Sequence, residues 1–242
     1  MEIQLAHVIK NYGTTEILHD VSLTLSVGGG AVLGLIGPNG AGKSTLMRLL
    51  SGITTINGGQ LTIDDSESHN YTRWAQRHTV YVPAGDRGLR NKLTLLENLQ
   101  YFSALRCERF ANVRQRFLDN IKLFDAEALI NKEFDQMSTG QKKKATLLVA
   151  ISLEPSLILL DEPSNGLDML AQVELMQLIK TVAQQSGKTI ILSSHDPVLM
   201  SGVTTQYVFI NGGRFIQTID HTLSEAELRE TYDQLFQKGA VS

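Results

Sequence analysis

Short apolar runs recur along the chain, and turn-forming residues bound each of them. These runs are Ala31–Ile36, Thr79–Val82, Leu157–Leu160, Thr189–Leu192 and Tyr207–Ile210. Because both faces of each run are apolar, the runs are typical of strands buried inside a parallel sheet. Between the third and fourth runs, Leu170–Gln185 has apolar positions at helical spacing. Strands that alternate with helices predict an α/β fold.

The N-terminal stretch and the middle of the chain follow other patterns. Residues 3–8 and 21–27 alternate apolar with polar side chains, which is typical of antiparallel strands with one face toward solvent. From about Thr94 to Gln136, apolar positions at helical spacing stand among many charges, which indicates a helical insertion. Ser224–Lys238 is predicted to form another amphipathic helix, with an N-cap and early acids.

These patterns divide one domain into three parts. We expect residues 1–85 and 145–220 to form the α/β core together with a small N-terminal antiparallel sheet. Residues 86–144 are expected to form the helical part, and residues 221–242 a C-terminal helix. The sequence has no internal repeat and no low-complexity linker, so a second independent domain is not predicted.

Composition and charge narrow the classes of protein to consider. Of the 242 residues, 42% are hydrophobic and 19% are charged, which favours a packed globule over a disordered chain. The net charge is -3, which is unlike a polyanion binder, so we expect no nucleic-acid partner. Cys107 is the only cysteine, so an internal disulfide is excluded.

Membrane and export signals are also absent from the sequence pattern. The chain begins MEIQLAHVIKNYG, which lacks the apolar core of a signal peptide. No apolar run approaches the ~20 residues that a membrane-spanning helix needs. We therefore expect a cytoplasmic protein, soluble by itself, that a partner would have to hold at the inner face of a membrane.

The segment Gly37 to Ser44 has the spacing Gly-x-x-x-x-Gly-Lys-Ser between a predicted buried strand and helical residues. Glycines allow backbone N–H groups to wrap a phosphate, and the positive end of the following helix points at the same anion. Lys43 supplies a charge for the β- and γ-phosphates, and the Ser44 hydroxyl is a ligand for Mg²⁺. The pattern predicts a MgATP site. The expected contacts are Gly37, Pro38, Asn39, Gly40, Ala41, Gly42, Lys43, Ser44 and Thr45.

Two acids, Asp161 and Glu162, follow the apolar run that begins at Leu157. Open α/β sheets place their ligands at the carboxyl ends of strands. Asp161 would reach Mg²⁺ directly or through water, and Glu162 would be positioned to activate the attacking water. Taken alone, the pair fits a solvated turn equally well. The phosphate loop favours the metal and catalytic interpretation.

A polar segment, Ser138-Thr139-Gly140-Gln141, is predicted to open a helix. Ser138 stands at the N-cap and Gln141 at the capping-box position. Lys142, Lys143 and Lys144 follow in the first turn, where cations oppose the helix dipole. An anion that docks at this helix end would resolve the conflict. A solvated basic patch would explain the lysines as well.

The order and spacing of these motifs resemble the ATP-binding cassette (ABC) ATPases over nearly the whole chain. Met137–Gln141 is similar to their signature sequence, with Met for the usual Leu and Thr for the usual middle Gly, and it precedes the Asp161-Glu162 strand by the family's typical interval. Ser164–Asp168 is similar to the D-loop. His195 resembles the switch histidine that contacts the γ-phosphate, and Tyr12 resembles the aromatic side chain that stacks on adenine.

The resemblance implies a fold and two cofactors. The fold is that of P-loop nucleoside triphosphatases (RecA-like), with a parallel-sheet core, a flanking antiparallel β-subdomain and an inserted α-helical subdomain. ATP and Mg²⁺ are the implied ligands. Ser44 and Asp161 would hold the metal. Glu162 and His195 would carry catalysis, the first by polarising water and the second by steadying the γ-phosphate.

The resemblance also implies partners. Two cassettes, identical or different, would close head to tail around two ATP molecules. Ser138, Gly140 and Gln141 of one chain would then face the γ-phosphate on Lys43 of the other, and Asp168 would cross the interface. Polytopic membrane permease subunits would be the further partners, contacted through residues 84–98 and the helical insertion.

One position departs from the family. After the strand Tyr81-Val82-Pro83 the family usually places a glutamine that touches Mg²⁺, and here Ala84 stands instead. Alanine can neither ligate a metal nor hold water. Asp86 is the residue nearby whose carboxylate suits Mg²⁺. A solvated turn pair of Asp86 with Arg87 fits the sequence equally well.

The leading functional interpretation is the energising subunit of an ABC transporter. Leu93–Leu99 and the short C-terminal tail resemble exporter-type cassettes, which favours export. A different class is a soluble ABC ATPase without a transport role, such as an assembly factor like the iron–sulphur scaffold ATPase. A third interpretation is a regulatory nucleotide-binding module that does not turn ATP over, against which Glu162 and His195 both argue.

Overall fold

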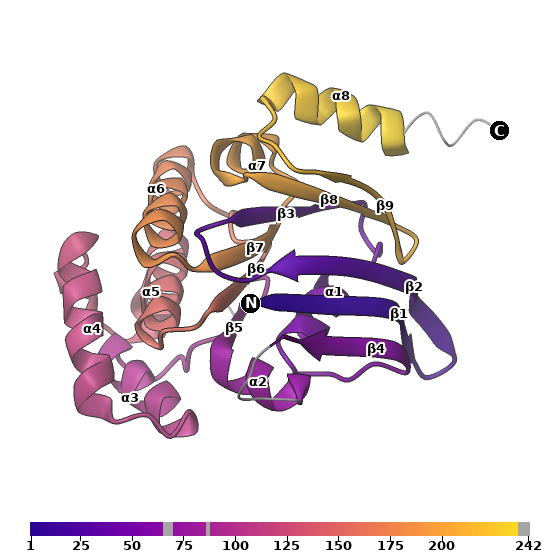
Figure 1. Cartoon of the computed structure of the whole chain (residues 1–242). Helices are drawn as coiled ribbons and strands as arrows, with labels where there is room; N and C mark the ends of the chain where they lie inside the picture. The colour runs from indigo at the N-terminus through magenta and orange to yellow at the C-terminus, as the bar shows by residue number, and fades with distance from the viewer. Residues whose placement is uncertain (65–69, 86–87, 237–242) are drawn as a thin grey trace.

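The computed structural model describes residues 1–64, 70–85 and 88–236. Within these ranges the larger sheet has the strand order β5-β6-β7-β3-β8-β9 (Figure 1). Its strands are β3 (Val32–Ile36), β5 (Thr79–Val82), β6 (Leu157–Asp161), β7 (Thr189–Ser193), β8 (Gln206–Asn211) and β9 (Arg214–Ile219). All neighbouring pairs are parallel except β8 with β9. The predicted α/β fold is confirmed, and each of the apolar runs forms a strand of this sheet.

Burial on both faces explains why these strands are continuously apolar. In β6, Ile158 and Leu160 face one hydrophobic cluster, while Leu157 and Leu159 face another. Because side chains alternate along a strand, each run must be apolar at every position to fill both clusters. The edge strand β9 is mostly exposed, so it lacks this signal, and sequence analysis did not predict it.

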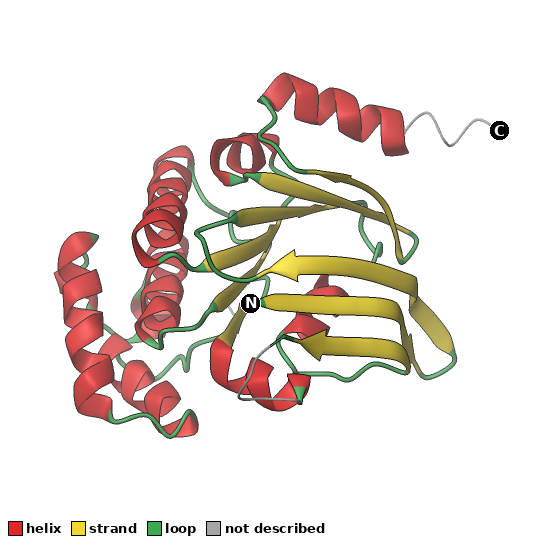
Figure 2. Cartoon of the chain, viewed as in Figure 1, coloured by secondary structure: helices red, strands yellow, loops and turns green. Residues whose placement is uncertain are grey.

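The second sheet is antiparallel, with the strand order β2-β1-β4 (Figure 2). Its strands are β1 (Glu2–Tyr12), β2 (Thr15–Ser26) and β4 (Gly58–Ile63). This outcome confirms the predicted small antiparallel sheet, although β1 and β2 are longer than the alternating runs and β4 was not predicted. Gly13 has a φ of 60° in the turn between β1 and β2, a conformation that glycine adopts without strain.

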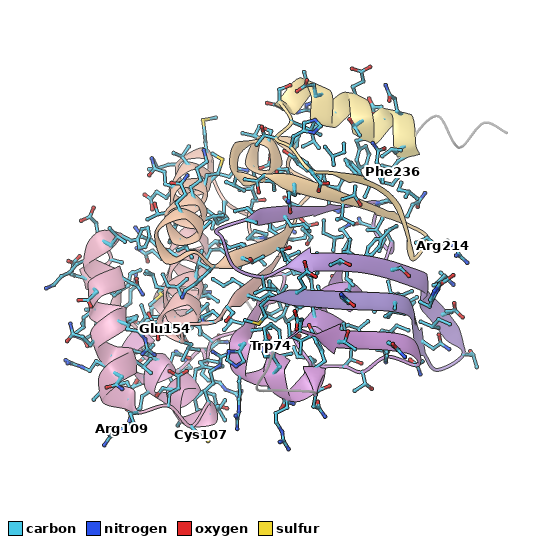
Figure 3. The ribbon with its side chains drawn as sticks, viewed as in Figure 1. Trp74, Cys107, Arg109, Glu154, Arg214 and Phe236 are labelled. Atoms are coloured by element: carbon cyan, nitrogen blue, oxygen red, sulfur yellow. The ribbon has the colours of Figure 1, made fainter. Side chains whose placement is uncertain are left out.

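Two groups of helices cover the two faces of the larger sheet. The helices α1 (Lys43–Leu50) and α2 (Tyr71–His78) pack between it and the antiparallel sheet. Trp74 of α2 lies at this junction (Figure 3). The opposite face is covered by α5 (Thr139–Ser152), α6 (Met169–Ser186), α7 (Pro197–Val203) and α8 (Glu225–Phe236). The helices α3 (Leu95–Leu105) and α4 (Phe110–Leu123) pack outside them, against α5.

The predicted helical insertion is present as α3 and α4, followed by short 3-10 helices at Glu127–Leu129 and Phe134–Gln136 (Figure 1). The expected division at residues 144 and 145 falls inside α5, which continues from the helical part into the core. The predicted C-terminal helix corresponds to α8, where the ring of Phe236 (Figure 3) lies 6.4 Å from that of Phe209 on β8. Residues 237–242 of that expectation lie outside the described residues.

None of the described helices combines the length and apolar character that crossing a membrane requires.

Candidate functional site

The phosphate-loop motif forms a tight turn between β3 and α1. Gly40 and Gly42 have φ values of 80° and 106°, in the region that side chains with a Cβ rarely adopt. Gly42 is the N-cap of α1. A Cβ at Gly37 would collide with the backbone oxygen of Ile210 on the neighbouring strand β8. The glycines of the motif are therefore required by backbone geometry as well as by ligand access.

The ammonium of Lys43 stands inside this turn. Its Nζ donates to the carbonyl oxygens of Gly37 at 2.6 Å and Pro38 at 3.1 Å. Burial lowers the pKa of Lys43, while the charges of Glu162 and Asp161 act in the opposite direction. A buried cation at the positive end of α1, surrounded by glycine backbone, is an arrangement that binds polyphosphate.

Asp161 ends β6, and its carboxylate is held by both neighbouring strands. Only 3% of the residue is exposed. Tyr81 of β5 donates its hydroxyl to Oδ2 at 2.9 Å, and Ser193 of β7 donates to Oδ1 at 2.8 Å. Burial raises the pKa of Tyr81 to about 12, so its hydroxyl stays protonated at neutral pH. Each carboxylate oxygen keeps a lone pair for a further ligand.

Glu162 follows in a left-handed backbone conformation, with a φ of 48°. Its N–H donates to the carbonyl of Ser193 at 3.0 Å, which fixes the turn. Such a conformation costs free energy in a residue with a Cβ. The turn directs the Glu162 carboxylate away from β6 and toward the loop that begins at Ser194.

The carboxylate of Glu162 meets His195. Oε1 lies 3.2 Å from His195 Nε2, and Oε2 accepts the His195 backbone N–H at 3.4 Å. Among the described residues, Oε1 is buried and has no partner with full hydrogen-bond geometry. Because burying a carboxylate oxygen without a donor is costly, Oε1 is free to accept a hydrogen bond from a bound ligand or water.

His195 also reaches the phosphate loop. Its Nε2 lies 2.9 Å from Asn39 Oδ1 and 3.4 Å from Lys43 Nζ. One ring nitrogen carries at most one proton, so Asn39 and Glu162 compete for it. The structure thus brings the expected residues of the loop, the acid pair and the switch histidine together within one network.

The expected signature residues form a separate place on the molecule. Ser138 caps α5, accepting the N–H of Gln141 at 3.3 Å, while Gln141 Oε1 accepts the N–H of Ser138 at 3.2 Å. Asp168 caps α6 by accepting the N–H of Ala171 at 2.8 Å. A cavity of about 560 Å³ is lined by residues that include Ser138, Gly140, Gln141 and Asp168. No residue of the phosphate loop lines it.

The lysines of the signature helix have partners within the chain. Lys142 Nζ lies 5.8 Å from the ring centroid of Phe134, Lys143 Nζ donates to the carbonyl of Gly85 at 2.8 Å, and Lys144 Nζ lies 3.4 Å from Glu174 Oε2. These contacts offset the conflict with the helix dipole. The helix can therefore tolerate its cations without a docked anion.

Tyr12 and Ala84 are both exposed. Tyr12 ends β1 with 44% of its surface exposed, and Lys10 Nζ lies 5.1 Å from its ring centroid. A base can therefore reach the ring. Ala84 is exposed directly after β5. The expected substitute ligand Asp86 lies outside the described residues, and so does Arg87.

Sequence analysis missed the side chains that support Asp161. Tyr81 lies within an apolar run, where an aromatic residue is usually part of the core, and Ser193 follows another. The available signal was a polar group at the end of each strand beside β6. The strand order β5-β6-β7, which the sequence pattern does not specify, is what brings the two hydroxyls to the same carboxylate.

Comparison with known proteins agrees with this geometry. A family model described as ABC transporter matches residues 18–165. The nickel import ATP-binding protein LarO of Lactiplantibacillus plantarum is 32% identical over 234 residues, covering 93% of this chain and 94% of that protein. The Nod factor export ATP-binding protein I of Cupriavidus pinatubonensis is 33% identical over 214 residues, covering 88% of this chain and 65% of that protein.

Among solved structures, the dimeric post-hydrolysis state of the ATP-binding cassette MJ0796, bound to ADP and phosphate, superposes with a TM-score of 0.75. It is 24% identical, and the match covers 90% of this chain and 98% of that one. This likeness concerns the fold. The family match and the 32% identity to LarO also establish the family. The chain belongs to the ABC transporter family, as an ATP-binding and ATP-hydrolysing subunit.

Proposed function

We propose that the chain hydrolyses MgATP with Glu162 as the general base and thereby energises transport through separate membrane subunits. The observation that carries this proposal is the buried Glu162 Oε1, which lies 3.2 Å from His195 Nε2 without a full hydrogen-bond donor. A carboxylate held in this way can accept a proton from an attacking water. Lys43 and His195, 3.4 Å apart, stand on the side where the γ-phosphate would bind.

The residues present fit a magnesium ion that arrives with the nucleotide. Among the described residues, no group of three or more His, Cys, Asp or Glu side chains gathers as a metal site. Mg²⁺ commonly binds through one or two carboxylates or hydroxyls together with substrate phosphates, and Ser44 and Asp161 supply that set. When bound, the ion would neutralise charge on the phosphates. Glu162 and His195 then orient the water and the γ-phosphate.

A second copy or a related cassette would complete the site. Within one chain, no residue of the phosphate loop lines the cavity at Ser138 and Gly140. Beside the cavity, Met169 and Leu170 at the start of α6 are 82% and 70% exposed. Exposed apolar side chains in a group favour a protein interface. We propose that the signature segment closes head to tail on the phosphate loop of the partner.

Membrane subunits are the further partners that we propose, with the chain at the cytoplasmic face of the membrane. The support comes from LarO, which is named an import protein, and from the Nod factor protein, which is named for export. Because these two relatives are about equally similar to the chain and differ in direction, the export inferred from Leu93–Leu99 stays a prediction. Their names favour transport over the soluble alternative.

The test of the general base is Glu162→Gln. Because glutamine keeps the shape but cannot accept a proton, ATP turnover should fall at least about 100-fold, while ATP affinity stays within a few-fold of wild type. Glu16→Gln is the control, since Glu16 pairs with His19 on β2, away from this site. Turnover would be followed by phosphate release and affinity by calorimetry. Unchanged turnover in Glu162→Gln would remove Glu162 from the proposed mechanism.

The test of the membrane partner is co-purification. The full chain would be expressed at its native level with an affinity tag and recovered from detergent-solubilised membranes. We expect a polytopic protein with several ~20-residue apolar segments in stoichiometric amount. Recovery of the chain from the soluble fraction alone would favour the ATPase without a transport role.

A further inference from the structure

The carboxylate of Asp161 is supported by a side chain from β5. Tyr81 Oη donates to Oδ2 at 2.9 Å, and Ser193 Oγ donates to Oδ1 at 2.8 Å. β5 and β7 flank β6 in the sheet, and Asp161 pairs with Ser193 in register. Tyr81 pairs with Leu159, two residues before Asp161, so its side chain lies on the same face of the sheet. The three strands together fix both oxygens.

The direction of the Tyr81 hydrogen bond is determined by its partner. An ionised carboxylate can only accept, so the Tyr81 hydroxyl donates its proton to Asp161 Oδ2. Tyr81 thus holds this oxygen of the carboxylate from the β5 side of the sheet.

This support matters in this chain because few metal ligands are available. Ala84 stands where a glutamine ligand was expected, and an alanine side chain has no ligand atom. Among the described residues of the site, Asp161 is then the carboxylate that would hold the metal together with the Ser44 hydroxyl. The orientation of a single carboxylate has a large effect when other protein ligands are few, because the groups around a ligand set its geometry.

We propose that Tyr81 is a positioning residue that holds Asp161 in the orientation in which it meets the Mg²⁺ of MgATP. Tyr81 itself touches neither nucleotide nor metal. The inference rests on the proposed function, since it assumes that Asp161 serves the metal. It goes beyond that function because it assigns part of the metal affinity to Tyr81 of β5, which donates a hydrogen bond to Asp161.

The experiment measures metal affinity rather than turnover. Mn²⁺ would replace Mg²⁺, and free Mn²⁺ would be followed by electron paramagnetic resonance as it is titrated into the full chain with a nonhydrolysable ATP analogue. Tyr81→Phe removes the hydroxyl and keeps the ring. We expect Mn²⁺ affinity to fall about tenfold, as for other groups that orient metal ligands. Affinity for the analogue without metal should stay unchanged.

Tyr71→Phe is the matched control. Tyr71 is buried, and its hydroxyl donates to the carbonyl of Leu50 at 2.7 Å, away from Asp161. Both variants lose one tyrosine hydroxyl and its hydrogen bond, so their thermal unfolding should shift by similar amounts. Only Tyr81→Phe should weaken Mn²⁺ binding.

The outcomes distinguish a failure of the positioning role of Tyr81 from a failure of the proposed MgATP site. Equal Mn²⁺ affinity in Tyr81→Phe and wild type would overturn the positioning role and leave the proposed function standing. An equal loss in Tyr71→Phe would also overturn it, because general loosening would then explain the effect. Absence of a nucleotide-dependent Mn²⁺ site in the wild-type chain would contradict the proposed function itself.

Discussion

The two halves of the proposed ATP site differ in how complete they are within one chain. Around the phosphate loop, His195 contacts both Lys43 and Glu162, and Asp161 is buried. Around Ser138 and Gly140, the helix start lines an open cavity with Asp168, and the side chains of Ser138 and Asp168 cap their own helices. The first half combines charged side chains with a strained backbone at Glu162, as preorganised sites do. The second half is a cavity that a partner chain would complete.

The largest effect is expected from a change in the phosphate loop, which should impair ATP binding itself. Lys43→Met removes the ammonium that stands inside the phosphate loop, so ATP should lose a major part of its charge stabilisation. We expect turnover to fall about 100- to 1000-fold and ATP affinity to fall as well, measured by phosphate release and calorimetry. Retained ATP affinity in this variant would show that the phosphate loop is not the half that binds ATP within one chain.

A change in the second half should have the opposite profile. Gly140→Asp adds a negative charge where the γ-phosphate of a partner's ATP would face, and its Cβ would lie 3.0 Å from the Cβ of Ala171. Turnover should fall about 100-fold, while one chain still binds ATP normally. Light scattering with ATP should then detect monomers. Loss of ATP binding by the single chain would contradict the division between the halves.

The tie between α5 and the turn after β5 can be tested through stability. Lys143 is 7% exposed and donates to the carbonyl of Gly85 at 2.8 Å. Lys143→Met should lower the free energy of unfolding by about 1 to 2 kcal/mol, because the carbonyl loses a charged donor. Lys144→Met is the neighbouring control, since an ion pair with an exposed glutamate contributes about 0 to 1 kcal/mol. Urea unfolding of both variants gives the comparison, and equal losses would argue against the tie.

The smallest effect compares two helix caps of the same type. Ser138 and Thr94 both form capping boxes, at α5 and α3 respectively. Replacing either by alanine should cost about 1 kcal/mol and lower Tm by about 2 to 4 °C. Only Ser138→Ala should also lower turnover. If Thr94→Ala lowers turnover equally, the effect of Ser138 belongs to stability alone.

Much of the fold could be predicted because burial dictated the sequence. The strands of the parallel sheet pack on both faces, so each is a continuous apolar run, and the phosphate loop needs glycines at fixed spacing. By contrast, β9 and β4 lie partly exposed and carry little pattern. Edge strands depend on pairing with a neighbour already in place, which a local pattern does not record.

The site divides in the same way. Lys43, Asp161, Glu162 and His195 stand at strand ends or in a motif with fixed spacing, so their grouping followed from the order of elements. Tyr81 did not, because its role depends on β5 lying beside β6, and its position in an apolar run resembles a core residue. A local sequence pattern therefore does not predict contacts between strands that are far apart in sequence.

The central claim is that each ATP site is built from two chains, and mixing two inactive variants tests it. Lys43→Met damages the phosphate loop, and Gly140→Asp damages the signature half. When two copies pair by a twofold axis, a mixed dimer has one site with both defects and one intact site. Turnover should therefore recover to about a quarter of the wild-type rate if pairing is random, and to about half if neither variant pairs with itself. If the mixture stays as inactive as the separate variants, the sites are not shared between copies of this chain.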